Sequence, residues 1–143
     1  MKTTISTLFF LGAVSLCLGS LDRTVAQQCG DQEAMVTDYK KDLGGLVETT
    51  RKESLADFEK GFHQKAFLTK LTFSLSMLNE LVSCLEKAVA DSTATKEQAD
   101  ATKAKLDTYT KLKDKVEGFR KKLKATDDPK EAKALIEKFD FSS

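Results

Sequence analysis

Hydrophobic residues recur at intervals of three and four along the segment 66–90, the most apolar part of the chain beyond its N-terminal region. This spacing predicts an α-helix. Phe73 and Met77 fall beside the main stripe, so the apolar surface is wide, as is typical of a helix that neighbours cover on more than one side. We therefore expect this segment to be the central helix of the fold. Its stripe comprises Phe67, Leu68, Leu71, Leu75, Leu78, Leu81, Val82, Leu85 and Val89.

A second helix is predicted upstream, between residues 31 and 62, where the apolar positions again follow helical spacing. Gly44 and Gly45 interrupt this segment. Because each glycine costs about 1 kcal/mol in a helix interior, we expect a kink or a break at this pair. Gly61 is the expected stop, since glycine is common just after the end of a helix.

Two more helix starts are marked downstream by local sequence. Thr95 followed by Gln98 fits a capping box, and the apolar positions after it predict a third long helix that ends at about Lys124. Asp128 followed by Pro129 is typical of an N-cap with proline at the first helical position. This pair predicts a short C-terminal helix.

Three long helices and a short one, joined by short loops, indicate an all-α fold. We expect an antiparallel up-and-down helical bundle that forms a single domain over residues 27–143. The charges agree with this arrangement. Residues 27–61 carry 5 basic and 8 acidic side chains, whereas residues 95–124 carry 10 basic and 5 acidic ones. The first and third long helices are therefore expected to complement each other across the bundle.

Residues 1–26 have the pattern of a signal peptide. Lys2 precedes an apolar run at 5–18, which is shorter than the roughly 20 residues that a membrane-spanning helix needs. Ala26 supplies a small residue for cleavage, and Gly19 is the second choice. An uncleaved membrane anchor is the alternative. We expect a secreted protein with no membrane span after cleavage.

Cleavage after Ala26 leaves two cysteines, Cys29 and Cys84. An even number of cysteines in a secreted chain is typical of disulfide bonding. The predicted disulfide is therefore Cys29–Cys84, within one chain or, as the alternative, between two chains.

The predicted hairpin does not bring these cysteines together by itself. If the first two long helices turn near His63, Cys29 lies roughly 20 Å beyond the level of Cys84, at a rise of 1.5 Å per residue. A disulfide needs Cα atoms within about 4.4–6.8 Å. We therefore expect residues 29–35 to hook back, or the helix to break at Gly44-Gly45. If neither occurs, the bridge joins two chains.

Composition argues against several classes of function. The whole chain has a formal net charge of +1, and residues 27–143 carry 21 basic and 21 acidic side chains. This balance gives no reason to expect binding to nucleic acid or to anionic membranes. His63 is the single histidine and is expected to be a solvated residue at a helix junction. With both cysteines oxidised, neither a thiol nucleophile nor a zinc site is predicted. We expect a protein that is not an enzyme and has no cofactor.

Binding functions remain. The leading hypothesis is a monomeric helical module that binds another extracellular protein through a groove or a helix face. The alternative is a carrier that holds an apolar, lipid-like small molecule in the bundle core. A plain packed core would explain the same residues. The candidate lining consists of Phe67, Phe73, Met77, Phe119 and Phe139.

A basic run near the end of the third long helix is a further candidate. It could contact an anionic partner, or it could be a solvated face that pairs with the acidic first helix. The run consists of Arg120, Lys121, Lys122 and Lys124.

Overall fold

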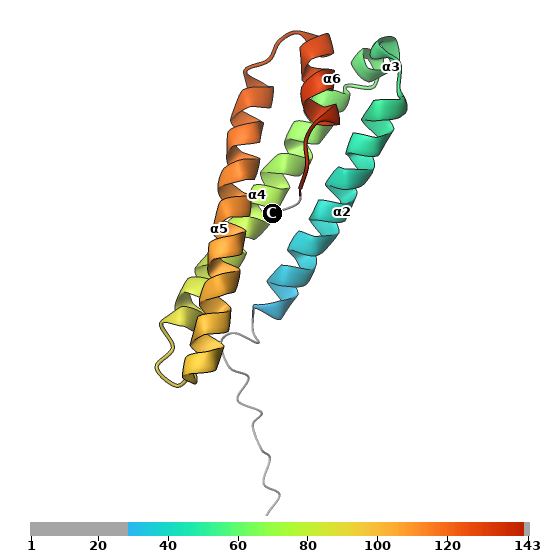
Figure 1. Ribbon diagram of the computed structural model, residues 1–143. Coiled ribbons are helices and arrows are strands. Elements are labelled where there is room, and N and C mark those ends of the chain that lie inside the picture. The colour runs from blue at the N-terminus through green and yellow to red at the C-terminus, as the bar shows by residue number, and fades with distance from the viewer. Residues whose placement is uncertain (1–28, 142–143) are drawn as a thin grey trace, which may run out of the picture.

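A computed structural model describes residues 29–141 and confirms the predicted helical bundle (Figure 1). The signal peptide predicted at 1–26 lies outside these residues. Within the described part of the chain there are five helices and no strand. The helices are α2 (Gly30–Lys52), α3 (Leu55–Lys60), α4 (His63–Val89), α5 (Lys96–Lys124) and α6 (Pro129–Glu137).

Helix α4 is the centre of the bundle, as predicted. It packs against α2 and α5 along its length and also contacts α3 and α6. Most of its apolar surface is therefore covered from several sides, although Phe73 remains 53% exposed. The residues that it buries are Phe67, Leu71, Ser74, Leu75, Leu78, Leu81, Val82, Leu85 and Ala88.

Helix α2 runs unbroken through Gly44 and Gly45, so the break, one of the two outcomes expected at this pair, is wrong. Leu43 and Val47 flank the pair and are 0% and 4% exposed. Burying a residue of this kind contributes about 1.5–3 kcal/mol, which offsets the helix penalty of the two glycines. A Cβ atom at either glycine would meet nothing within 4 Å, so no neighbouring helix requires glycine here.

The first helix also ends earlier than expected. Helix α2 stops at Lys52, and α3 starts with its own N-cap, Ser54, whose Oγ accepts a hydrogen bond from the backbone N–H of Asp57 at 3.2 Å. The reversal between α2 and α4 therefore occupies residues 53–62 and contains a separate short helix. This cap was the sequence signal that the predicted single helix overlooked.

The longer reversal resolves the position of the disulfide. Cys29 precedes Lys52 by 23 residues, and Cys84 follows His63 by 21, so the two arms of the hairpin are nearly equal. Cys29 and Cys84 are bonded within one chain, with their Cα atoms 5.8 Å apart. Neither a hook at 29–35 nor a break in α2 is needed.

The predicted starts of α5 and α6 are confirmed. Thr95 Oγ1 accepts from the backbone N–H of Gln98 at 3.2 Å, and Gln98 Oε1 accepts from the backbone N–H of Thr95 at 2.9 Å. Asp128 Oδ1 accepts from the backbone N–H of Lys130 at 2.8 Å, and Pro129 is the first residue of α6. Each helix therefore begins where its local cap satisfies the free N–H groups of the first turn.

Polar contacts hold the helices in place at the surface. Lys105 Nζ lies 2.9 Å from Glu33 Oε2, so the basic α5 and the acidic α2 do meet. Arg51 Nε and Nη2 donate to the carbonyl oxygen of Glu137 at 3.0 and 2.8 Å, which fixes the end of α6 against α2. Exposed pairs of this kind contribute about 0–1 kcal/mol each, so they orient the helices more than they stabilise the fold.

Candidate functional site

The backbone between α3 and α4 turns at an unusual residue. Phe62 has φ 53° and ψ 34°, and it is the only non-glycine residue between 29 and 141 with a positive φ. A left-handed conformation costs an L-residue other than glycine roughly 1–2 kcal/mol. Gly61, the predicted stop, caps α3 but has an ordinary φ of −79°. The left-handed position is therefore occupied by phenylalanine, one residue beyond the available glycine.

The side chain of Phe62 is also unusually exposed. Phe62 is 74% exposed, more than any other large hydrophobic residue between 29 and 141. Strain and exposure thus coincide at one residue, and a glycine there would relieve both. Backbone outliers of this kind are a reason to propose a function. The other exposed large hydrophobic residues are Met35, Leu55 and Phe73, at 48%, 38% and 53%.

His63 fixes the corner between α3 and α4. A Cβ atom at Gly61 would lie 2.0 Å from His63 Nε2, so the imidazole occupies the space over the glycine. His63 Nδ1 is 2.8 Å from Glu53 Oε2, and its ring centroid is 6.1 Å from that of Phe58. The histidine is therefore half-buried and links the start of α4 to the end of α2. His63 therefore lies at a helix junction, as expected, but its side chain is only 31% exposed.

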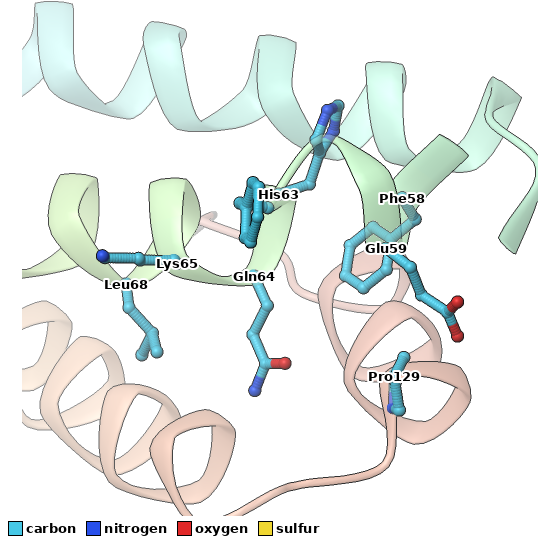
Figure 2. Close-up of a pocket in the computed structure, with 8 residues that line it drawn as sticks. Phe58, Glu59, His63, Gln64, Lys65, Leu68 and Pro129 are labelled. Carbon is cyan, nitrogen blue, oxygen red and sulfur yellow. The ribbon is translucent and has the colours of Figure 1, made fainter. Parts of the chain in front are cut away.

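A pocket of about 260 Å³ lies beside Phe62. Figure 2 shows Phe58 and Glu59 of α3 next to Pro129 of α6, with Gln64 and Leu68 extending from α4. Gln64 Nε2 donates to the carbonyl oxygens of Leu123 and Thr126 at 3.0 and 2.8 Å, which fixes this wall to the end of α5. The residues that line the pocket are Phe58, Glu59, Phe62, His63, Gln64, Lys65, Leu68 and Pro129. We call Phe62 and these neighbours the α3–α4 corner.

The candidate apolar lining is only partly brought together. The Phe119 ring meets Phe67 edge-on at a centroid distance of 6.1 Å and stacks on Phe139 at 3.8 Å. Met77 is half-buried against the core, but Phe73 is 53% exposed on the outside of α4. Three of the five residues therefore form one aromatic cluster, and rings stacked at 3.8 Å leave no space for a ligand between them.

The candidate basic run is divided around α5. Because successive helical residues are rotated by about 100°, Lys122 lies on the side opposite Arg120 and Lys124. Lys121 Nζ is 2.8 Å from Glu117 Oε1, and this hydrogen bond holds the pKa of the Glu117 carboxyl below its ordinary value. The four cations therefore do not form a single patch.

Other kinds of site receive no support from residues 29–141. No group of three or more His, Cys, Asp or Glu side chains is placed there to hold a metal ion. In the same residues, no helix combines the length and the apolar character that crossing a membrane requires. Comparisons with models of known protein families, with curated proteins and with solved structures found no match to the chain.

Proposed function

We propose that this chain is a secreted helical protein that acts by binding another protein, and that the partner contacts the α3–α4 corner. The observation that carries the proposal is Phe62, whose backbone is strained and whose ring is 74% exposed. The strained backbone and the exposed ring both raise the free energy of the isolated folded protein. A partner that buried the ring would remove its apolar surface from water.

The energies support a role for this ring as an anchor. Burying a phenylalanine side chain contributes about 1.5–3 kcal/mol, which corresponds to roughly a 10- to 150-fold gain in affinity. Aromatic side chains are enriched in protein interfaces, where an apolar centre is surrounded by a polar rim. Here Leu68 and Pro129 supply apolar surface beside the ring, and Glu59 and Lys65 supply polar groups.

An extracellular location is supported by two independent features. A disulfide joins Cys29 to Cys84, and disulfides persist mainly in oxidising compartments. Residues 1–26 have the charge and hydrophobicity of a signal peptide. Secretion and binding without catalysis are thus parts of the same proposal. The alternative of an apolar-ligand carrier draws no support from Phe119 and Phe139, whose rings are already in contact.

The test compares Phe62→Gly with Val89→Ala, which shortens a partly exposed apolar side chain at the opposite end of α4. Each protein is immobilised, and partners are captured from the extracellular fluid of its source. We expect wild type and Val89→Ala to retain the same partner and Phe62→Gly to lose it. Phe62→Gly should nevertheless be folded and at least as stable as wild type, because glycine accepts a left-handed backbone.

Two results would contradict the proposal. One is a Phe62→Gly variant that captures the partner as well as wild type does. The other is equal loss of the partner in both variants, which would indicate general surface stickiness and not a site at the corner. Circular dichroism and urea unfolding of both variants establish that neither loss comes from unfolding.

A further inference from the structure

Two of the exposed hydrophobic residues are not explained by the α3–α4 corner. Met35 lies on α2 and is 48% exposed, and Phe73 lies on α4 and is 53% exposed. Each is a large apolar side chain on a helix whose other large apolar residues are mostly buried. Their positions relative to one another follow from the register of the two helices.

The register of α2 and α4 is set by two contacts. Cys29 is bonded to Cys84, and Asp42 Oδ2 lies 3.1 Å from Lys70 Nζ. The helices are therefore antiparallel, and each step of one residue forward along α2 corresponds to about one residue backward along α4. In this register position 35 is level with position 77 or 78, and position 39 is level with position 73 or 74.

The same contacts show which faces of the helices meet. Met35, Tyr39 and Asp42 are spaced four and three residues apart and share one face of α2. Lys70, Phe73 and Met77, spaced three and four apart, share one face of α4. The Asp42–Lys70 pair joins these faces, and Lys70 Nζ is 6.0 Å from the centroid of the Tyr39 ring.

Met35, Tyr39, Phe73 and Met77 therefore line one seam, which we call the α2–α4 seam. Tyr39 and Met77 are half-buried, and Met77 packs against the core, whereas Met35 and Phe73 are 48% and 53% exposed. None of the described helices covers this seam. It presents the thioethers of Met35 and Met77 at one level of the bundle and the rings of Tyr39 and Phe73 about one helical turn away.

The charges beside the seam are mainly acidic. Asp31 and Asp38 lie four residues before and three after Met35, and Glu80 lies three after Met77, so all three adjoin the seam. Their side chains are exposed. Asp42 is already paired with Lys70. The surface is thus apolar along its middle and negative along its edges.

This combination selects one kind of occupant. A second copy of the chain would place the same carboxylates against each other, which like-charge repulsion disfavours. A helix with apolar residues on one face and lysine or arginine beside them matches both the apolar middle and the acidic edges. We propose that the α2–α4 seam binds a cationic amphipathic helix of a partner protein.

The probe is a synthetic 14-residue amphipathic peptide of leucine and lysine, and its control is the same peptide with glutamate in place of lysine. Affinity is measured by fluorescence anisotropy with the oxidised full-length mature protein at low and high salt. We expect the lysine peptide to bind more tightly than the glutamate peptide. Added salt should weaken its binding, because the edge charges are exposed.

Variants locate the binding. Phe73→Ser should weaken the lysine peptide about tenfold, since it removes a central apolar contact. Asp38→Asn combined with Glu80→Gln should reduce the salt dependence while leaving the apolar contact intact. Phe62→Gly is the matched control and should bind like wild type, so that failure of this proposal is distinguishable from failure at the α3–α4 corner.

Several outcomes would overturn the inference. They are the absence of binding by the lysine peptide, equal binding of both peptides, or no effect of Phe73→Ser. Amide chemical-shift changes centred on α5, away from α2 and α4, would also overturn it. Self-association of the wild type that Phe73→Ser abolishes would assign the seam to a second copy instead.

Discussion

Removal of the disulfide tests the topology of the bundle most directly. The change is the double substitution Cys29→Ala and Cys84→Ala, which deletes the covalent link between the start of α2 and the last third of α4. Cys29 is fully buried, so alanine avoids the unpaired hydroxyl that serine would place there. The helices themselves retain their caps and their apolar contacts.

The magnitude follows from the length of the closed loop. The two cysteines are 55 residues apart in sequence. In the chain-entropy model, a cross-link that closes such a loop raises the free energy of the denatured chain by about 4 kcal/mol. Domains of this kind have unfolding free energies of about 5–15 kcal/mol. We therefore expect the double variant to fold, with a large part of its stability lost.

The assay is urea unfolding followed by helical circular dichroism at 25 °C. Oxidised wild type, reduced wild type and the double variant are compared, and the last two should agree because both lack the cross-link. The dependence of the unfolding free energy on urea should also increase, since an unlinked denatured chain exposes more surface. A loss below about 1 kcal/mol would refute the reasoning, as would a dimer of oxidised wild type that dissociates on reduction.

Four further predictions concern single residues. Gly61→Ala should lower the unfolding free energy by about 1 kcal/mol, because the new Cβ displaces the His63 ring. In a His63→Ala background the same substitution should be neutral or stabilising, and a double-mutant cycle measures this difference. Thr95→Ala should lower stability by about 1 kcal/mol through loss of the capping box, and Thr95→Ser, which keeps the hydroxyl, should not. Leu78→Ala should lower it by about 2–5 kcal/mol in urea unfolding, because Leu78 is 0% exposed. Burial and the Glu33 charge raise the pKa of Tyr109 above its ordinary value of 10.0. The contribution of the protonated phenol to the unfolding free energy is therefore fully present below pH 10.0 and is lost as the pH rises through the higher pKa of the folded state. Tyr109→Phe should flatten this alkaline loss of stability, and an unchanged pH dependence would contradict the assignment.

Local chemistry determined the parts of the fold that depend on residues close together in the chain. The starts of α5 and α6 were predicted at Thr95 and Asp128, and both are found there, because a cap is a hydrogen bond between groups two or three residues apart. The α2–α3 boundary obeys the same rule at Ser54. It was missed because the apolar spacing across residues 31–62 also resembled one helix with a break at the two glycines.

Burial could not be predicted residue by residue. Phe67 and Phe73 lie in the same apolar segment, yet the first is 1% exposed and the second 53% exposed. Both are compatible with helical spacing, and only the positions of α2, α5 and α6 around α4 separate them. The α2–α4 seam therefore emerged from the register of two helices, although each of its residues was visible in the sequence.

The α3–α4 corner shows the same limit at the level of the backbone. The sequence alone determined that a helix ends near Gly61, because glycine followed a run of helix-compatible residues. It did not determine that Phe62 would adopt the left-handed conformation, with the His63 ring over the glycine. In that arrangement His63 Nδ1 lies 2.8 Å from Glu53 Oε2, which belongs to the residue that follows α2. Local hydrogen bonds and periodicity thus determined the helices, whereas contacts between distant residues decided where the chain reverses and which apolar side chains remain exposed.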